Sequence, residues 1–204
     1  MSETLTGILT VIAAYLLGGI PFGLIIVKLK TGEDVRQSGS GNIGATNVLR
    51  TTGRAAGVLT LLLDAGKALL AVWLADHFTA GSPLWMSAAA LAVLCGHAFS
   101  LWLKFQGGKA VASFVGAYAY LTPLPLLAVL LIFVLITGRT RYLSLGSVIA
   151  AGLLPLAAWM ILHPDWPVLL STLFAAILVI YRHKGNLERI QDGTERRFRF
   201  GKSA

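Results

Sequence analysis

Three polar segments of this sequence combine residue types that bind phosphate groups. The first, Ser38–Asn47, places glycines at positions 39, 41 and 44 among hydroxyl and amide side chains. Glycine leaves the backbone open, so neighbouring N–H groups can converge on an anion. We expect a helix to begin near Ala45, which directs its N-terminal amides toward the same anion. The candidate binding residues of this segment are Ser40, Gly41, Asn42, Gly44, Thr46 and Asn47.

An arginine follows this first segment. Thr46, Arg50 and Arg54 are spaced by four residues, so we expect them to share one face of the helix. The guanidinium of Arg50 can present a planar fork of donors to phosphate oxygens. A flexible glycine-serine linker is the alternative interpretation, and the density of Asn, Thr and Arg side chains argues against it.

The second segment, Lys104–Lys109, reads Lys-Phe-Gln-Gly-Gly-Lys ahead of an expected helix. Two glycines and a lysine in that position are typical of phosphate-binding loops, which makes Gly107, Gly108 and Lys109 candidates. A Walker A motif is excluded, because Ala110 stands in place of the Ser or Thr that holds magnesium. Nucleotide hydrolysis is therefore not implied. Taken alone, the segment is equally well explained as an ordinary turn with a cytoplasmic lysine.

The third segment, Tyr181–Arg189, follows the last apolar stretch of the chain. His183, Asn186 and Arg189 are spaced by three residues and are expected to line one helical face. An imidazole can exchange a proton near neutral pH or support a phosphate, so His183 and Asn186 are candidate site residues. The alternative is a cluster of cations that merely ends a membrane span.

These segments belong to a strongly apolar chain. Of its 204 residues, 56% are hydrophobic and 13% are charged, whereas soluble domains carry roughly 25% charged residues. A soluble fold of this size could not bury so much apolar surface, but a lipid bilayer accepts it on every outward face. We therefore predict an all-α polytopic membrane protein with about seven transmembrane helices, which form a single domain over residues 1–204.

The apolar runs give the expected spans. The first run contains Gly18, Gly19 and Pro21, which predict close packing or a kink. No positive residue precedes it and no small-residue cleavage site follows it, so we interpret it as a retained span rather than a signal peptide. The run after position 110 is too long for one span, and prolines at 123 and 125 divide it. The expected spans are residues 5–27, 55–75, 84–103, the two parts of 110–136, 143–162 and 167–181.

The cations predict the orientation. Of the 17 Lys and Arg residues, 16 fall in residues 28–54, 104–109, 139–141 and the tail from Arg182. The positive-inside rule then places the N-terminus outside and the C-terminus in the cytoplasm. The net charge of +8 fits anionic lipids or anionic substrates. A nucleic-acid partner is not expected, because the cations are divided among loops and form no nucleic-acid-binding motif. The distal cations are predicted to contact lipid headgroups; they are Arg196, Arg197, Arg199 and Lys202.

Few polar or reactive residues lie within the apolar runs. Asp64 and Lys67 are three residues apart, and we expect them to form a structural ion pair on one helix. His97 by itself is better explained as a buried polar residue bonded to the backbone than as a catalyst. Cys95 is the only cysteine, so it forms no internal disulfide and is expected to serve packing.

The three polar segments together resemble one enzyme family. Ser38–Asn47, Gly96–Ser113 and Tyr181–Arg189, in this order and spacing, look like the three sequence blocks of PlsY-type acyl-phosphate:glycerol-3-phosphate acyltransferases. The resemblance covers nearly the whole chain, and the first block is highly specific. Two departures are visible: Ala110 follows Gly-Gly-Lys where the family usually has glycine, and Leu187 stands where isoleucine is common.

The resemblance implies a reaction. The enzyme is expected to transfer an acyl group from acyl phosphate to the 1-hydroxyl of glycerol 3-phosphate. The products are 1-acylglycerol 3-phosphate (lysophosphatidic acid) and inorganic phosphate, in the synthesis of bacterial membrane phospholipids. The expected location is the inner cell membrane, with the active site on the cytoplasmic face. The enzyme that forms acyl phosphate is the implied functional partner.

The resemblance also implies residue roles. The first block and Lys109 are expected to hold the phosphate of acyl phosphate. Arg50, His183 and Asn186 are expected to hold glycerol 3-phosphate. The implied catalytic residues are His183, Lys109 and Arg50. Neither a metal nor another cofactor is expected.

Two points stay open at this level. The family places a serine in the turn before the sixth span, where this chain offers Ser144 and Ser147, and we favour Ser147. The hydroxyl proton could go to His183 or to a phosphate oxygen of the donor. We favour the phosphate, because no carboxylate in the sequence evidently pairs with a histidine.

Three other functions fit the sequence less well. Acyltransferases that use thioester donors typically contain His-x4-Asp, and none of the four histidines has Asp five positions later. A magnesium-dependent phosphatidyl transferase needs clustered Asp residues, but only Asp64 lies within a span. A transporter of organic phosphates needs binding groups at the midplane that both sides can reach. Here the candidate groups lie on one side of the membrane.

Overall fold

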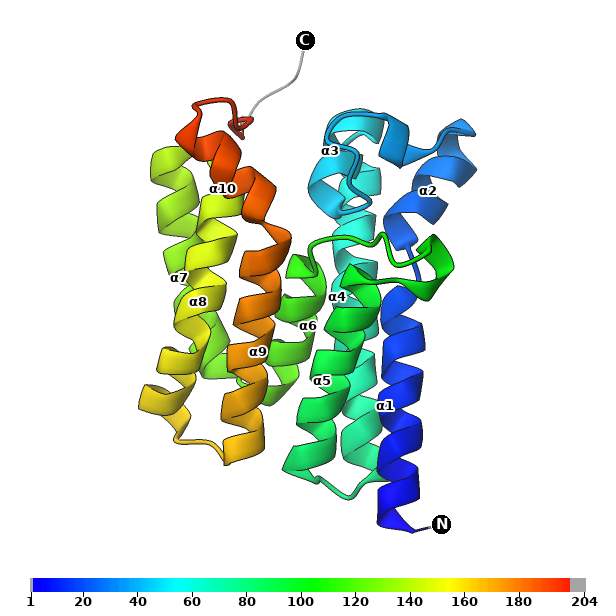
Figure 1. Ribbon diagram of the computed structural model, residues 1–204, viewed down its shortest axis with the longest axis vertical. Coiled ribbons are helices and arrows are strands. Elements are labelled where there is room, and N and C mark those ends of the chain that lie inside the picture. Colours follow the sequence, from blue (N-terminus) through cyan, green and yellow to red (C-terminus); the bar gives the residue numbers. More distant parts are fainter. Residues whose placement is uncertain (1, 199–204) are drawn as a thin grey trace. The chain divides into compact units, whose positions relative to one another are not determined.

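The computed structural model describes residues 2–198, and the regular secondary structure of that part is entirely helical (Figure 1). The all-α prediction is therefore confirmed. The chain divides into two compact units, Met1–Leu121 and Thr122–Ala204. Each unit positions its own share of the polar segments, and we describe each by itself.

The first unit contains six α-helices and two short 3-10 helices. Helix α1 packs against α5 and α4, and α4 also packs against α3, α5 and α6. Within this unit, the N-terminus and the turn between α4 and α5 lie at one end, and α2, α3 and residues 101–110 lie toward the other end (Figure 1). The elements are α1 (Glu3–Gly19), α2 (Phe22–Thr31), η1 (Val35–Gln37), α3 (Ala45–Thr52), α4 (Arg54–Phe78), α5 (Pro83–Ala98), η2 (Leu101–Leu103) and α6 (Val111–Leu121).

The predicted kink in the first span separates α1 from α2. Pro21 has no N–H group, so the turn before it leaves carbonyl groups without helical partners. A Cβ atom on Gly18 would lie 2.1 Å from the carbonyl oxygen of Val93, so only glycine allows α1 this close to α5. Side chains from later in the chain donate to the interrupted turn: Trp102 Nε1 to Leu16 O (3.3 Å), Ser100 Oγ to Gly19 O (2.6 Å) and Lys67 Nζ to Ile20 O (2.8 Å).

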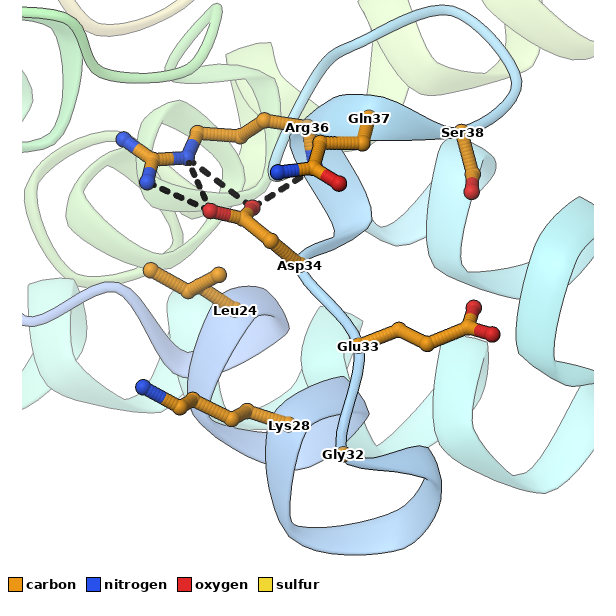
Figure 2. Close-up of a pocket in the computed structure, with 8 residues that line it drawn as sticks. All are labelled: Leu24, Lys28, Gly32, Glu33, Asp34, Arg36, Gln37 and Ser38. Carbon is orange, nitrogen blue, oxygen red and sulfur yellow. Dashed lines mark hydrogen bonds and ion pairs between the residues drawn. The ribbon is translucent and has the colours of Figure 1, made fainter.

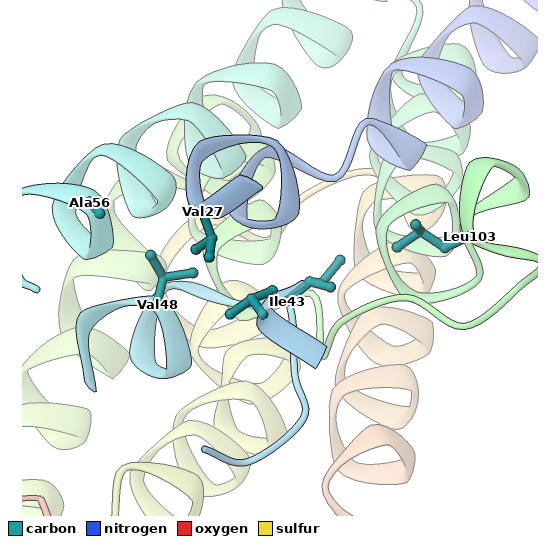
Figure 3. Packing of buried hydrophobic residues seen from close by; sticks show 6 residues of the cluster. Val27, Ile43, Val48, Ala56 and Leu103 are labelled. Carbon is teal, nitrogen blue, oxygen red and sulfur yellow. The ribbon is translucent and has the colours of Figure 1, made fainter. Parts of the chain in front are cut away.

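A cluster of buried side chains supports the first polar segment (Figure 3). It joins α2, η1, the polar segment itself, α3, α4 and η2, and full burial of an aliphatic side chain is worth about 1.5–3 kcal/mol. The backbone also approaches closely here, because a Cβ atom on Gly23 would lie 1.9 Å from the carbonyl oxygen of Ile43. The first polar segment is therefore held in place by the buried side chains that pack beneath it. The cluster consists of Val27, Val35, Ile43, Val48, Ala56 and Leu103.

The second unit is an up-and-down arrangement of helices. Helix α8 packs against both α7 and α9, and a short helix, α10, follows α9 after a bend of 53°. A Cβ atom on Gly146 would lie 2.4 Å from Thr137 Oγ1, so α7 and α8 pack closely near their shared turn. The elements are α7 (Pro123–Thr140), α8 (Leu143–Leu162), α9 (Trp166–Arg182) and α10 (Lys184–Gln191).

Five helical segments in the described part of the chain are long and apolar enough to cross a membrane, and a sixth counts if α9 and α10 form one bent span. The remaining expected span, the first part of residues 110–136, corresponds to α6, an apolar helix of 11 residues. Eleven residues extend about 16 Å at 1.5 Å per residue, roughly half of a ~30 Å hydrocarbon core. The helix is short because the break before Pro123, expected from the sequence, comes early in the long apolar run.

Candidate active site

The first polar segment forms a tight loop before α3. Gly39 and Gly41 have φ angles of +64° and +70°, which side-chain-bearing residues rarely adopt. Helix α3 begins at Ala45, as the sequence predicts. The residue before it, Gly44, donates its N–H to Asn42 Oδ1 at 2.8 Å. The carbonyl oxygen of Gly44 accepts from the N–H groups of Asn47 and Val48, and the N-terminal end of a helix is a place where backbone amides bind anions.

Asn47 holds this loop together from inside. Its side chain is buried, with 2% exposed. Its Nδ2 donates to the carbonyl oxygens of Val35, Ser38 and Asn42, at 3.2, 3.1 and 2.9 Å. Its Oδ1 accepts from the N–H of Ser40 at 2.8 Å. Asn47 therefore positions the loop, and its predicted contact with a substrate stays a prediction.

The other candidates of this segment are more open. Ser40, Gly41 and Thr46 are exposed, and Asn42 and Gly44 are half-buried. Their accessibility is what contact with a ligand requires. Position 39 is also restricted by Asn47, because a Cβ atom on Gly39 would lie 2.2 Å from Asn47 Oδ1.

Replacing Asn47 with aspartate is expected to open the loop while the helices stay folded. The change keeps the shape of the side chain but places an acceptor oxygen against three carbonyl oxygens. The two hydrogens of Nδ2, which the three carbonyl oxygens share, are lost at about 1 kcal/mol per hydrogen bond, and repulsion is added. Amide hydrogen exchange should accelerate across residues 38–47. Asn42→Asp is the matched control, because its Oδ1 can still accept from Gly44; equal exchange in the two variants would contradict this role of Asn47.

Arg50 lies on α3 and its side chain is exposed. The expectation that Arg54 continues the same helical face is wrong. Helix α3 ends at Thr52, and Gly53, with a φ angle of +108°, separates it from α4, which begins at Arg54. Spacing by four residues therefore relates Thr46 to Arg50 only.

The second polar segment folds back against the end of α5. The N–H of Gly107 donates to the carbonyl oxygen of Ala98 at 3.2 Å, and the N–H of Gly108 donates to that of His97 at 3.0 Å. Lys109 follows directly, two residues before α6 begins at Val111, and it is half-buried. The two glycine amides are thus occupied by the backbone of α5. The side chain of Lys109 is the part of this segment best suited to phosphate.

Ala110 adopts a conformation that favours glycine. Its φ angle is +60°, and its methyl group is fully buried. The left-handed region destabilises a non-glycine residue by roughly 1–2 kcal/mol. The glycine that the resemblance leads us to expect here would adopt this conformation without that penalty.

The polar residues within the spans pair with one another. Asp64 and Lys67 form the predicted ion pair on α4, with 2.7 Å between Asp64 Oδ1 and Lys67 Nζ and side chains only 2% exposed. His97 is buried as expected, but its Nδ1 faces side chains rather than the backbone, at 3.2 Å from Lys67 Nζ and 3.6 Å from Asp64 Oδ1. Cys95 is a free, half-buried cysteine.

The second unit contains its own polar cluster, at the bend between α9 and α10. His183 forms the bend, so it precedes α10 rather than lying on its face. The side chains of His183 and Asn186 are buried, with 3% and 8% exposed. His183 Nδ1 lies 2.7 Å from the carbonyl oxygen of Val179. A carbonyl only accepts, so Nδ1 carries the proton, and Nε2 of the neutral ring is the nitrogen that can accept one.

Glu195 is a central residue of this cluster that the sequence analysis did not identify. It accepts hydrogen bonds from Asn186 Nδ2 (2.6 Å), Ser144 Oγ (2.9 Å) and Arg189 Nε (2.9 Å). Burial opposes the charge of Glu195, but these three donors outweigh it and lower the pKa of the carboxyl group. At pH values above 4.5, the ordinary pKa of a glutamate, the carboxylate therefore contributes its full stabilisation to the tail. This contribution is lost as the pH falls through the lowered pKa.

The two candidate serines differ in their partners. Ser144 shares Glu195 with Asn186, whereas the hydroxyl of Ser147 donates to the carbonyl oxygen of Leu143 at 2.8 Å. The choice of Ser147 as a substrate-binding residue stays a prediction. Of the distal cations, Arg197 lies over the ring of Tyr142, 5.7 Å from its centroid. Arg199 and Lys202 lie outside the described residues.

A cavity of ≈ 560 Å³ opens beside the start of the first polar segment (Figure 2). Its wall contains the ion pair between Asp34 and Arg36, with 2.5 Å between Oδ2 and the guanidinium nitrogen. Hydrogen bonds from Arg36 lower the pKa of Asp34 to about 2. The negative charge of Asp34 therefore offsets most of the positive charge of Arg36. Lys28 is the other cation in the wall of the cavity. The lining residues are Leu24, Lys28, Gly32, Glu33, Asp34, Arg36, Gln37 and Ser38.

Comparison with known proteins identifies the family. The model of the glycerol-3-phosphate acyltransferase family matches residues 8–193, which include all three polar segments. The chain belongs to the glycerol-3-phosphate acyltransferase family. A glycerol-3-phosphate acyltransferase of Trichlorobacter lovleyi is 45% identical over 196 residues, covering 95% of this chain and 98% of the relative. Another from Geobacter sulfurreducens is 44% identical and covers 94% and 97%.

Two solved structures also match this chain, and each match covers 95% of its length. Both are crystal structures of PlsY, an integral membrane glycerol 3-phosphate acyltransferase. The glycerol 3-phosphate form is 38% identical, with a TM-score of 0.88 and 96% of that chain covered. The lysophosphatidic acid form is 36% identical, with a TM-score of 0.85 and 95% covered. The family resemblance and the membrane fold expected from the sequence are both confirmed.

Proposed function

We propose that this chain transfers an acyl group from acyl phosphate to the 1-hydroxyl of sn-glycerol 3-phosphate. The products are lysophosphatidic acid and inorganic phosphate. The observation that carries the proposal is the match to PlsY structures in a glycerol 3-phosphate form and a lysophosphatidic acid form, which represent the acceptor and its acylated product. The glycine loop before α3, with Arg50, supplies the phosphate-binding chemistry that both substrates need.

The reaction requires positioning and charge neutralisation rather than a protein nucleophile. The 1-hydroxyl oxygen attacks the acyl carbon, a new C–O ester bond forms, and the bond between the acyl carbon and the phosphate oxygen breaks. Phosphate departs with the electron pair of that bond. An acyl phosphate is a mixed anhydride with a good leaving group, so holding the reactants in line accounts for much of the acceleration.

We assign the residue roles that the family resemblance implies. The first polar segment and Lys109 hold the donor phosphate. Arg50, His183 and Asn186 hold glycerol 3-phosphate, with Ser147 as a further contact. The hydroxyl proton goes to a phosphate oxygen of the donor or to His183. The bond from His183 Nδ1 to Val179 leaves Nε2 as the accepting nitrogen, which supports a role for either proton transfer or phosphate contact.

Both substrates are anionic and the donor carries a lipid tail, which fits a membrane enzyme with basic loops. We place the protein in the bacterial inner membrane, with its three polar segments on the cytoplasmic side and a link to the enzyme that supplies acyl phosphate. The distribution of cations supports this orientation. Within the first unit, the loops after α2 and α5 lie opposite the N-terminus (Figure 1).

Cysteine labelling tests the orientation. A cysteine introduced at Ser40 or Lys184 is expected to resist a membrane-impermeant thiol reagent applied from outside, whereas one at Ser82 should react. Each variant is made in a Cys95→Ala background, and permeabilised cells serve as the control in which all three react. Outside labelling of the Ser40 position in intact cells would overturn the cytoplasmic active site.

Turnover is expected to need no divalent cation and to survive strong chelation. Hard metal ions need several oxygen ligands, usually including carboxylates. Among residues 2–198, no group of three or more His, Cys, Asp and Glu side chains could hold a metal ion. Arg50, Lys109 and backbone amides are present to neutralise phosphate directly. Activity of the purified protein is measured with and without a chelator; loss with chelator and recovery with magnesium would contradict direct neutralisation.

Donor selectivity tests the proposed reaction against other acyltransferases. Purified protein is given glycerol 3-phosphate with either palmitoyl phosphate or palmitoyl-coenzyme A. Lysophosphatidic acid is expected from the phosphate donor only. Product from the thioester alone would contradict the proposal, although it would leave the family membership intact.

A further inference from the structure

His97 connects a buried charged network to the second polar segment. Lys67 Nζ has three partners: Asp64 Oδ1 at 2.7 Å, Ile20 O at 2.8 Å and His97 Nδ1 at 3.2 Å. His97 Nδ1 also lies 3.6 Å from Asp64 Oδ1, so this ring nitrogen faces both members of the ion pair. The network thereby fixes the rotation of the imidazole ring from one side.

The opposite side of the ring lies against Gly108. A Cβ atom on Gly108 would lie 2.3 Å from His97 Nε2, and 3.1 and 3.3 Å from the adjacent ring carbons Cδ2 and Cε1. The φ angle of Gly108 is outside the left-handed region, so its backbone conformation does not require glycine. Glycine is required here because the imidazole ring of His97 occupies the space that a Cβ atom would need.

Gly107 shows a different constraint. A Cβ atom there would lie 2.0 Å from the carbonyl oxygen of His97 and 2.8 Å from the carbonyl group of Ala98. Those atoms are backbone, and they also accept the hydrogen bonds of Gly107 and Gly108. No side-chain change can relieve a clash at Gly107. The two glycines therefore offer a matched pair, one restricted by a side chain and one by backbone.

We propose that His97 is a positioning residue: its ring and carbonyl group, fixed by Lys67 and Asp64, set the path of Gly107 and Gly108 and so the place of Lys109. The inference rests on the proposed function, in which Lys109 binds a substrate phosphate. It assigns a task to the ionisable residues inside the membrane spans. It also explains the two glycines by packing against α5 rather than by approach of a phosphate.

A second contact anchors the network to the far end of the same loop. Ser113, in the first turn of α6, donates its hydroxyl to the backbone carbonyl oxygen of Asp64 at 3.2 Å. Asp64 thus lies between the helix that follows Lys109 and the lysine that holds His97. Lys109 is bracketed by residues that contact the network, Gly108 before it and Ser113 after it.

Paired substitutions test the proposal. His97→Asn keeps a polar atom at the position of Nδ1 but removes Nε2, the ring atom nearest to a Cβ at position 108, together with Cε1. Gly108→Ala alone is expected to lower kcat/KM about 100-fold, as a displacement of about 1 Å can. Adding His97→Asn should restore about tenfold of that loss, as expected for coupled residues in contact. Gly107→Ala should lose a similar factor and gain nothing from His97→Asn.

The KM and kcat values separate positioning from general destabilisation. In Gly108→Ala, KM for acyl phosphate is expected to rise while KM for glycerol 3-phosphate stays near the wild-type value, measured on protein shown to be folded by size-exclusion chromatography. A uniform fall in kcat with both KM values unchanged indicates a merely structural role and overturns the proposal. Equal activity of Gly108→Ala with and without His97→Asn also overturns it, because Gly108 is then needed for the phosphate and not for the ring.

A readout without turnover separates this proposal from the proposed function. The thermal unfolding temperature of the same variants in detergent reports coupling between positions 97 and 108 whether or not the protein acylates anything. The destabilisation by Gly108→Ala is expected to shrink when His97→Asn is present. Additive shifts would refute the contact as the reason for glycine. If wild-type protein forms no lysophosphatidic acid but the shifts are coupled, the proposed function fails and the packing role stands.

Discussion

Lys109→Ala is expected to lower kcat/KM at least about 100-fold, because it removes a cation from a partly desolvated phosphate site. Lys109 is half-buried between two buried neighbours, Gly108 and Ala110. Its charge is therefore less screened by water than that of a surface lysine, and it is worth more to a phosphate. The assay compares initial rates of lysophosphatidic acid formation by equal amounts of folded protein.

Lys104→Ala is the matched control for this change. Lys104 belongs to the same loop but is exposed, at the turn after η2. Removing it changes the net charge by the same amount, so any general effect on attraction of anionic substrates appears in both variants. Near-normal activity of Lys109→Ala, or equal losses in the two variants, would contradict the role of Lys109.

Arg50→Lys is expected to lose about 100-fold in kcat/KM although the charge is conserved. A guanidinium holds phosphate through two parallel hydrogen bonds, and an ammonium at the end of a flexible chain cannot reproduce that geometry. Misplacement of a substrate by about 1 Å is enough for a loss of this size. Steady-state kinetics with each substrate varied in turn measure the effect.

Arg54→Lys provides the comparison. Arg54 is four residues away but begins a separate helix after Gly53, and we expect this variant to keep near-normal activity. If Arg50→Lys also works normally, the site needs only a positive charge on α3. If both variants fail, the two arginines act together in spite of the break between their helices.

Local sequence patterns predicted most of the helical framework. Glycine and proline carry this information, because their effects on the backbone depend little on distant residues. Gly44 precedes α3, Pro21 separates α1 from α2, and Pro123 begins α7, each as expected. The ion pair of Asp64 and Lys67 was also predictable, since both partners lie on one helix.

Contacts between distant segments were not predictable in the same way. Asn47 looked like one of several exposed binding residues, yet its amide bonds with carbonyl groups up to 12 residues away. The space taken by His97 beside Gly108 depends on how the loop returns to α5, which spacing alone does not encode. Glu195 looked like one charge in a polar tail, and only the folded second unit shows that it joins Ser144 to Asn186.

The most direct test of the account is a product balance with purified wild-type protein. The protein is incubated with palmitoyl phosphate and sn-glycerol 3-phosphate in the presence of a chelator, and lysophosphatidic acid and inorganic phosphate are quantified together. Equal amounts of the two products are predicted, with the ester at the 1-position and no reaction when glycerol 3-phosphate is omitted. Release of phosphate without the ester, or formation of the ester only from a thioester donor, would contradict the account.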